Sequence, residues 1–450
     1  MELRPYQNRI ANWLCDHPHA CLSVGMGLGK TAAVLHFIDH TLDVYPAATF
    51  LIVAPKRVAE TVWRQEAEKW ELWRVARNMV LVSGTPKQKE AAAASTAPIK
   101  IVGRDNLKYF EHAEFDVLVI DELTSFKSMT AERTKLVLSI KATRKIGMTG
   151  TFAPNGLLDV YGQLAAVGIA SPDAGDFYAW RGRWFVDVLK AAKVRFHKWQ
   201  LRNGVTEAQA LGDWTRDIIT LTTEDYLQLP PMMVDVVTVP LTEAERKAYD
   251  DLVAALHFEI PGEDFDFTVD EKARFAKIQT LCSGFVYDTE DGGKPIRIGG
   301  GGAKVDAAVE FCRRAAAEGE SVLLFYQYRE TAVWFGELAQ KAGLRIASVN
   351  GGSYEWLRKW EGGELDVLVA NPASAGHGLN LQHGGHIVLW LELTYNYEYY
   401  AQANARLHRT GQVKPVQVTA LVAEDTVDGA VWGALQRKSQ TNRRVEAVTK

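Results

Sequence analysis

Apolar and polar positions alternate in a regular way along both halves of the chain. Short apolar runs in the first half predict strands at 49–54, 80–82, 99–102, 117–120 and 145–148. A second series of such runs lies at 321–326, 345–349, 365–369, 386–391 and 416–421. Segments with helical spacing, for example 58–73 and 304–317, separate them. Single strands alternating with helices are typical of α/β folds with mostly parallel sheets, and two such series predict two similar lobes.

A proline pair marks the predicted boundary between the lobes. Leu229-Pro230-Pro231 stiffens the chain and ends any local helix. We therefore expect a first lobe at 1–228, with a helical protrusion at about 170–215, and a second lobe at 229–450. The glycine run 299–302 is interpreted as a hinge rather than a phosphate site, because no Lys-Thr or Lys-Ser pair follows it.

Composition narrows the class of protein without assigning a function. The 450 residues include 51 Lys and Arg against 55 Asp and Glu, a net charge of −4, so any nucleic-acid surface must be a local basic patch. The four cysteines form no C-x-x-C pair, which argues against a zinc site or disulfide framework. Neither a signal peptide nor a membrane-length apolar run is recognised, so we expect a cytoplasmic protein.

A glycine-rich loop follows the apolar segment that begins at His19. It reads Gly25-Met26-Gly27-Leu28-Gly29-Lys30-Thr31 and leads into helix-forming residues. Glycines let backbone N–H groups turn around phosphate oxygens, and the start of a helix adds favourable partial charge. Lys30 is expected to reach the β- and γ-phosphates of ATP, and the Thr31 hydroxyl to bind Mg²⁺. Val24 stands where the strict pattern has a glycine, so an ordinary strand-to-helix turn is the alternative.

Two adjacent acids end the predicted strand at 117–120. Carboxylates at the carboxyl edge of a parallel sheet face the crevice in which ligands bind. Asp121 is expected to hold Mg²⁺, and Glu122 to orient and deprotonate the attacking water. A solvated acidic turn is the alternative, which the upstream glycine loop makes much weaker.

Two arginines three residues apart lie near the other end of the chain. Arg406 and Arg409 fall in Gln402–Gln412 and would share one face of a helix. Guanidinium groups suit γ-phosphate oxygens and can speed phosphoryl transfer by roughly 10³–10⁵-fold. A solvated basic helix is the alternative, which the flanking Gln-Ala and Gly-Gln pairs disfavour.

These stretches together resemble superfamily-two helicases, and in detail the Snf-type branch of chromatin remodellers and DNA translocases. The motifs occur in the family's order: Met26–Thr31, Trp63-x-x-Glu66-x-x-x-Trp70, Thr149-Gly150-Thr151, Leu229-Pro230-Pro231, Ala375–Leu381 and Gln402–Gln412. The resemblance implies two tandem RecA-like lobes with ATP in the cleft between them. It also implies a DNA-dependent ATPase that moves on double-stranded or branched DNA, in a compact bacterial or phage form. A strand-separating helicase and an ATP-switched DNA clamp with little turnover are the alternatives.

The same resemblance assigns further site residues. It implies that Arg4, Gln7, Gly25, Met26, Gly27, Leu28, Gly29 and Gln402 contact ATP together with Lys30, Thr31 and Asp121. It implies nucleic-acid or coupling roles for Lys56, Arg57, Arg104, Thr149, Thr151, Ser374, Gly378 and Asn380.

Some positions depart from the family or allow two interpretations. Thr124 replaces the usual histidine after the acid pair, so it cannot supply that ring's link between motifs. Phe152-Ala153 interrupts the usual Thr-Pro order, and Thr220–Thr223 replaces a basic stretch. The aromatic and basic residues between Trp180 and Trp199 either pack a protrusion or contact DNA, and packing is favoured slightly.

Overall fold

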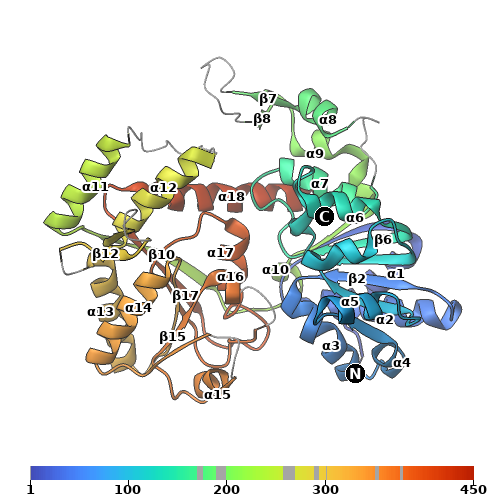
Figure 1. The fold of residues 1–450 in the computed structure, drawn as a ribbon, viewed down its shortest axis with the longest axis horizontal. Helices are drawn as coiled ribbons and strands as arrows, with labels where there is room; N and C mark the ends of the chain where they lie inside the picture. The colour runs from blue at the N-terminus through green and yellow to red at the C-terminus, as the bar shows by residue number, and fades with distance from the viewer. Residues whose placement is uncertain are drawn as a thin grey trace. The chain divides into compact units, whose positions relative to one another are not determined.

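The computed structural model describes residues 2–169, 176–188, 199–256, 269–287, 293–299, 302–349, 354–375 and 379–450, with the backbone alone at 269–273 and 374–375. The chain forms two units (Figure 1). The described residues of unit 1 lie within Met1–Val186, Trp199–Gln228 and Lys438–Lys450, and those of unit 2 within Asp187–Lys198 and Leu229–Arg437. None of the described helices is long and apolar enough to cross a membrane.

Unit 1 is built on a seven-stranded sheet in the order β3-β4-β2-β5-β6-β1-β9. Every pairing in it is parallel. In sheet order the strands are β3 (Met79–Val82), β4 (Ile99–Gly103), β2 (Phe50–Ala54), β5 (Glu114–Asp121), β6 (Lys141–Thr149), β1 (His19–Val24) and β9 (Ile218–Leu221). The α-helices of the unit are α1 (Pro5–Asp16), α2 (Lys30–Val44), α3 (Trp63–Lys69), α4 (Trp73–Arg77), α5 (Pro86–Ala93), α6 (Glu132–Ser139), α7 (Leu158–Ala166), α8 (Phe177–Trp184), α9 (Glu207–Leu211) and α10 (Thr223–Tyr226).

Short turns of other helix types complete unit 1. A π-helical turn, η1 (Val58–Val62), precedes α3, so the helix expected at 58–73 is interrupted. The remaining turns are 3₁₀-helical: η2 (Arg104–Phe110), η3 (Leu123–Phe126) and η5 (Gly212–Asp217).

Unit 2 has a six-stranded sheet in the order β10-β17-β16-β13-β15-β14, again parallel throughout. Its strands are β10 (Met232–Val239), β17 (Val416–Ala423), β16 (Ile387–Trp390), β13 (Val322–Phe325), β15 (Val367–Ala370) and β14 (Ile346–Ser348), and β11 (Phe285–Tyr287) pairs with β12 (Pro295–Arg297) in a separate hairpin. The helices are α11 (Glu243–Ala255), α12 (Val269–Cys282), α13 (Ala303–Ala317), α14 (Arg329–Lys341), α15 (Glu355–Glu361), α16 (Pro372–Ala375), α17 (Tyr397–Asn404) and α18 (Val427–Thr449). The expected fold class, α/β with a mostly parallel sheet in each of two units, is confirmed.

Alternate residues of one strand show why the sheet of unit 2 is apolar on both faces. In β13, Val322 and Leu324 enter a core with α13 and α14. Leu323 and Phe325 enter a second core with α12, α15 and α17 on the opposite face. Successive strand side chains point to opposite faces, so helices must cover both sides, as Figure 1 shows. This explains why the strands read as continuous apolar runs.

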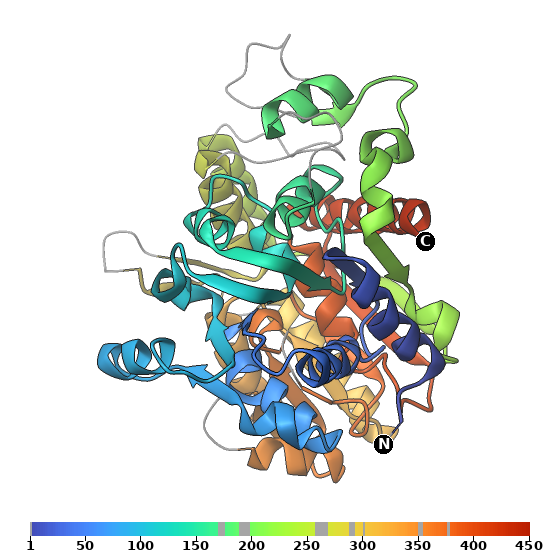
Figure 2. The ribbon, with the colours of Figure 1, turned by 90° about the vertical axis from the view of Figure 1, so that its right-hand side faces the viewer.

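The end of the chain returns to unit 1. Residues 229–450 are expected to form the second lobe, but Lys438–Lys450 belong to unit 1 by their contacts. The physical reason is Val445, which is fully buried in the core of unit 1. Figure 2 shows the last turns of α18, in dark red, beside the green segment of unit 1.

The aromatic and basic stretch between Trp180 and Trp199 begins with a residue that packs in the core of unit 1. Trp180 is fully buried and its Nε1 donates to the Ala210 carbonyl at 3.0 Å. Its ring lies 5.4 Å from those of Tyr161 and Trp214, and the Arg181 guanidinium lies 4.0 Å from the Trp199 ring centroid. The structure therefore supports packing for Trp180. The basic residues of the stretch at 190, 193, 195 and 198 lie outside the described residues.

Candidate active site

Three neighbouring strands of unit 1 end at one edge of the sheet. The pairings Ser23↔Thr149 and Asp121↔Met148 place β1, β6 and β5 in register up to their last residues. The glycine loop leaves β1, the acid pair leaves β5, and Thr149-Gly150 leaves β6. Ligands bind at such carboxyl edges of parallel sheets. The sheet therefore brings together three motifs that are far apart in the sequence.

The glycine loop adopts a conformation that other residues would not tolerate. Gly27 and Gly29 have φ values of 83° and 76°, and Gly29 caps the start of α2. A Cβ on Gly25 would lie 2.5 Å from Thr223 Oγ1, and one on Gly29 would collide with the Gln7 amide. The loop thus leads directly into the N-terminus of a 15-residue helix, where backbone N–H groups and partial positive charge favour phosphate.

Lys30 lies at the centre of this edge. Its Nζ donates to the carbonyl oxygens of Val24, at 2.6 Å, and Gly25, at 3.4 Å. A Cβ on Gly150 would lie 3.6 Å from Lys30 Nζ and 2.9 Å from Met26 Cγ. The residue after β6 therefore lies against the phosphate loop, with no room for a side chain. Thr31 follows on the first turn of α2 and is partly exposed.

Asp121 is a partly buried carboxylate held by a tryptophan. Trp63 Nε1 donates to Asp121 Oδ2 at 3.0 Å. Burial raises the pKa of Asp121 to about 6, against the opposing effects of the Lys30 ammonium and the Trp63 hydrogen bond. A divalent cation would favour the ionised carboxylate, so one carboxylate and the Thr31 hydroxyl fit the few protein ligands that Mg²⁺ takes beside phosphate and water.

Glu122 has an unusual backbone and two hydroxyl neighbours. Its φ and ψ are 65° and 70°, a left-handed conformation that costs about 1 kcal/mol for a residue other than glycine. Its Oε1 lies within hydrogen-bond distance of Thr124 Oγ1, at 3.2 Å, and Thr149 Oγ1, at 3.4 Å. The Thr149 hydroxyl also lies 2.7 Å from the Thr151 carbonyl oxygen, so these two acceptors share its one hydrogen. Thr124, which stands where the resembled family usually has a histidine, thus contacts Glu122 through its hydroxyl.

Gln7 supports the loop from α1. Its Nε2 donates to the Leu28 carbonyl at 3.1 Å, and its Oε1 accepts from the Arg4 backbone N–H at 2.9 Å. Gln7 is buried and Arg4 is exposed. This geometry shows Gln7 bracing the loop, and the adenine contact of the two residues stays a prediction.

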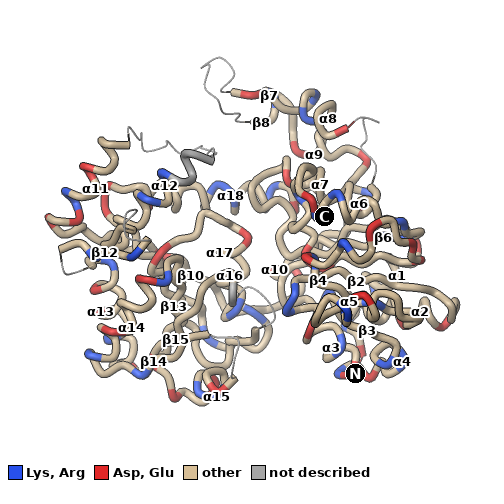
Figure 3. The backbone as a smooth tube through the Cα atoms, in the orientation of Figure 1, with Lys and Arg blue, Asp and Glu red and all other residues tan. Residues whose placement is uncertain are grey.

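Three basic residues follow two other strands of the same sheet. Lys56 and Arg57 come after β2, Arg104 comes after β4, and Ala54 pairs with Gly103 at the ends of these strands. Arg104 donates to Ser125 Oγ at 2.6 Å, and Ser125 lies in η3 directly after the acid pair. Lys56 is exposed. Elsewhere Lys and Arg are interspersed with Asp and Glu along the described parts of both units (Figure 3).

The two late arginines of unit 2 lie on a turn, not on a helix. Helix α17 ends at Asn404, so the expectation that Arg406 and Arg409 share a helix face is wrong. Leu407, in the turn that follows the helix, is fully buried. Both guanidinium groups nevertheless converge, because each donates through Nη1 to the Leu379 carbonyl at 3.1 Å.

The other expected residues of unit 2 are only partly described. Gln402 is buried in α17 and donates to Glu398 Oε1 at 3.4 Å. Asn380 is exposed. Gly378 and the side chain of Ser374 lie outside the described residues. Within unit 1 the structure brings Lys30, Asp121, Glu122 and Thr149 together, and within unit 2 it brings the arginines together.

Two contacts of the site had no signal in the sequence. Thr223 Oγ1 donates to the Met26 carbonyl at 3.2 Å and lies against Gly25. Asn442 contacts the loop after β6 from the distant end of the chain. Only pairing of segments far apart in sequence reveals either contact.

Comparison with known proteins gives consistent matches. A family model described as SNF2-related domain matches residues 6–283. Protein p41 of Acyrthosiphon pisum secondary endosymbiont phage 1 is 30% identical over 95% of this chain and 94% of its own. An ATP-dependent helicase of Mycoplasma genitalium is 24% identical over 97% of this chain and 42% of its own length. The human DNA annealing helicase and endonuclease ZRANB3 is 25% identical over 92% of this chain and 37% of its own length.

The chain thus spans nearly all of the phage protein but less than half of the last two relatives. A solved structure, the Sulfolobus solfataricus SWI2/SNF2 ATPase core in complex with dsDNA, aligns with a TM-score of 0.44 and 18% identity. That alignment covers 99% of this chain and 93% of the other.

Proposed function

The chain belongs to the SNF2-related family of ATP hydrolases, and we propose that it is an ATPase stimulated by double-stranded DNA that moves along the duplex. The observation that carries the proposal is the meeting of Lys30, Asp121 and Glu122 at the ends of adjacent parallel strands. This is the set of groups that hydrolysis of a nucleoside triphosphate needs: a cation for the phosphates, a metal ligand and a base.

The roles of the residues follow from their chemistry. The start of α2 and the Lys30 ammonium bind the β- and γ-phosphates. Thr31 and Asp121 hold Mg²⁺, which when bound neutralises charge on the phosphate oxygens. Glu122 accepts the proton of the attacking water, and its partner Thr149 holds the carboxylate in orientation.

We propose that Arg406 and Arg409 complete the reaction from unit 2. Their guanidinium groups already converge on one carbonyl oxygen. Two guanidinium groups that point to the same place can bind the negative charge that develops on a transferring phosphoryl group. Hydrolysis would then require both units, and a cycle of closing and opening could move the protein along its track.

Two observations support DNA as the polymer along which the protein moves: the name of a relative and the position of three basic residues. The human relative is named as a DNA annealing helicase and endonuclease. In this chain the basic residues Lys56, Arg57 and Arg104 lie on the edge that carries the acid pair, and Arg104 is linked to it through Ser125. Backbone phosphates are the groups such side chains bind without reading sequence.

The test is ATP hydrolysis measured with duplex DNA, single-stranded DNA, branched DNA and RNA. We expect the largest stimulation by duplex or branched DNA, falling with salt by roughly 0.9 log units in affinity per log unit of salt for each phosphate contacted. Triplex displacement reports movement along the duplex, and a forked substrate reports strand separation. Stimulation by RNA or single strands alone would contradict the proposal. Efficient opening of the fork would favour a strand-separating helicase, and binding without turnover an ATP-switched clamp.

A further inference from the structure

The last turns of α18 dock on unit 1 through one face. Asn442, Val445 and Thr449 are spaced by three and four residues, so they lie on the same side of the helix. All three are buried. Val445 packs in the core that contains Phe152, and Thr449 Oγ1 lies 2.7 Å from Thr220 Oγ1. Val445 contributes ordinary apolar packing, whereas Asn442 is a buried polar side chain at the beginning of the docked turns.

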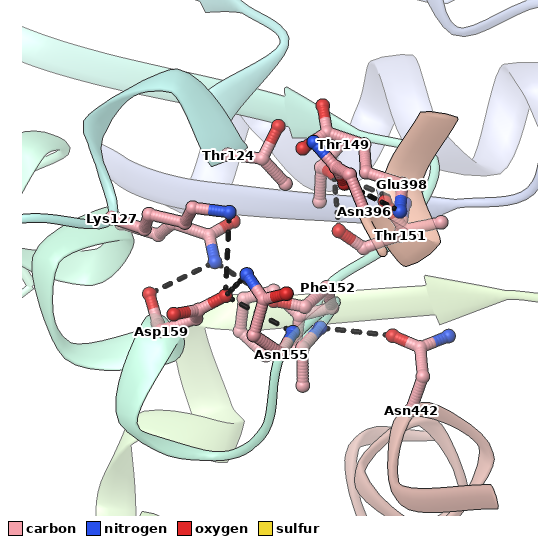
Figure 4. A network of polar contacts seen from close by, with 12 residues as sticks. Thr124, Lys127, Thr149, Thr151, Phe152, Asn155, Asp159, Asn396, Glu398 and Asn442 are labelled. Carbon is pink, nitrogen blue, oxygen red and sulfur yellow. Dashed lines mark hydrogen bonds and ion pairs between the residues drawn. The ribbon is translucent and has the colours of Figure 1, made fainter. Parts of the chain in front are cut away.

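Asn442 makes one defined hydrogen bond with each end of its amide. Its Oδ1 accepts from the backbone N–H of Ala153 at 2.9 Å (Figure 4). Its Nδ2 donates to Glu446 Oε1 at 2.7 Å. The first bond fixes which end of the amide faces Ala153, because a backbone N–H needs an acceptor and only the oxygen of the amide can accept. The buried N–H of Ala153 is thereby satisfied from the far end of the chain.

The segment that Asn442 holds begins at Thr149. Figure 4 shows that neighbouring residues of this segment are held by different helices. Gln163 of α7 donates to the Phe152 carbonyl at 2.8 Å. The backbone N–H of Asn155 donates to Asp159 Oδ2 at 3.1 Å, and the Lys127 ammonium lies 3.6 Å from the same oxygen. The segment 149–155 is therefore fixed at both ends, and Asn442 holds its middle.

The other end of the segment touches the base. Thr149 Oγ1 lies 3.4 Å from Glu122 Oε1 and hydrogen-bonds with the backbone of Thr151, as acceptor from its N–H at 3.1 Å and as donor toward its carbonyl at 2.7 Å. A shift of the backbone at 151–153 would therefore move the hydroxyl that holds Glu122. Three residues separate Thr149 from Ala153, and the covalent chain and the hydrogen bonds between Thr149 and Thr151 connect them.

We propose that Asn442 is a positioning residue for ATP hydrolysis. By accepting from Ala153 it holds the segment 149–155 so that Thr149 orients the Glu122 carboxylate toward the attacking water. Asn442 touches neither substrate nor base and acts through the segment. The inference rests on the proposed function, in which Glu122 is the base.

Three variants separate positioning from stability. Asn442→Leu keeps the size of the side chain but removes the acceptor. Asn442→Asp keeps an acceptor oxygen for Ala153, and at pH 6.5 a protonated Glu446 can donate to the new carboxylate. Thr449→Val is the matched control, because it removes a buried hydrogen bond on the same helix face away from the segment. The readouts are kcat and KM for ATP with duplex DNA, and Tm.

We expect Asn442→Leu to lower kcat about tenfold, because a misplaced catalytic group loses rate without loss of substrate binding, so KM stays within about twofold. Asn442→Asp should recover most of the rate. Thr449→Val should lower Tm by about 2–4 °C while kcat stays near wild type. In a Thr149→Val background, Asn442→Leu should have little further effect on kcat.

The outcomes distinguish this inference from the function on which it rests. Wild-type protein without DNA-stimulated ATP hydrolysis would overturn the proposed function, and the inference with it. A stimulated wild type with an equally active Asn442→Leu would overturn the inference alone. So would a loss of kcat by Thr449→Val as large as that of Asn442→Leu, or an Asn442→Asp variant no better than Asn442→Leu, because either result makes Asn442 merely structural.

Discussion

The proposed catalytic edge of unit 1 and the arginine turn of unit 2 are built in different ways. In unit 1, Asp121 and Thr149 are the last residues of the adjacent parallel strands β5 and β6, and the loop to Lys30 leaves the next strand, β1, so the register of the sheet sets where they lie. In unit 2, Arg406 and Arg409 lie beyond the end of α17, and both guanidinium groups donate to the Leu379 carbonyl. A site fixed by a sheet tolerates little motion, whereas a turn beyond a helix can change its geometry at small cost. The difference suits a fixed binding site and a group that engages during the cycle.

The largest expected effect belongs to the fixed edge. Glu122→Gln should lower kcat by about 10³–10⁴-fold, because the amide cannot accept the proton of the attacking water. ATP affinity should change little, since the phosphates are bound by Lys30 and the start of α2. Phosphate release and nucleotide binding measure the two properties. Near-normal turnover would remove Glu122 from the role of base, and Lys30→Ala, which should instead weaken ATP binding, is the contrasting variant.

The arginine turn of unit 2, Arg406 and Arg409, is expected to affect the rate of hydrolysis more than the affinity for ATP. Arg409→Ala should lower kcat with DNA by about 10³-fold, at the low end of the range for guanidinium groups on a transferring phosphoryl group, with a smaller change in ATP affinity. Arg358→Ala is a matched control in unit 2, since that arginine is exposed and forms a surface ion pair with Glu364. Wild-type turnover by Arg409→Ala would show that the turn takes no part in hydrolysis.

The interior of unit 2 offers a test that is independent of catalysis. Lys304 and Asp428 form a buried ion pair at 2.6 Å, with exposed fractions of 1% and 2%. Lys304→Met leaves the Asp428 carboxylate without its cation and should lower the free energy of unfolding by about 3 kcal/mol. The double variant with Asp428→Asn removes both charges and should recover part of the loss. Denaturant unfolding checks both, and an unaffected Lys304→Met would show that the carboxylate is protonated or solvated.

The features that were predicted correctly from the sequence are those that short local patterns determine. The predicted α/β fold and SNF2-type family are confirmed, and so is the enzyme class, an ATP hydrolase. The glycine loop and the acid pair are short motifs on apolar strands, so their pattern already implies the edge where they meet. The roles of the site residues stay predictions.

Features that depend on distant packing were not predicted. The pattern did not indicate β9 or β10, because the strand signals of both are short or follow a proline pair. The arginines were expected on a helix, since their spacing alone cannot show that α17 ends at Asn404 and that the chain continues as a turn. The sequence of α18 does not separate its first turns from its last, and the contacts of Asn442, Val445 and Thr449 assign the last turns to unit 1.

The smallest expected effect concerns the surface on which α18 docks. Burial raises the pKa of Glu446 from 4.5 to about 7, against the Asn442 hydrogen bond, while Glu224 raises it further and Arg443 and Lys450 lower it. The folded protein therefore binds this proton more tightly than the unfolded chain. Stability from this group is complete below about pH 4.5 and is lost as the pH rises toward 7.

Glu446→Gln removes this ionisation while keeping an oxygen for the Asn442 amide to donate to. The variant should therefore gain about 1 kcal/mol of stability over wild type at pH 8 and almost nothing at pH 4.5. Asp225→Asn is the control of opposite sign, because hydrogen bonding to Lys450 lowers the pKa of Asp225 and its loss should slightly destabilise the protein at pH 8. Thermal unfolding measures the change in Tm of each of the two variants at pH 4.5 and at pH 8. An equal shift of Glu446→Gln at pH 4.5 and pH 8 would mean that the side chain changes packing rather than charge, and the docked end of α18 would then not be sensitive to pH through Glu446.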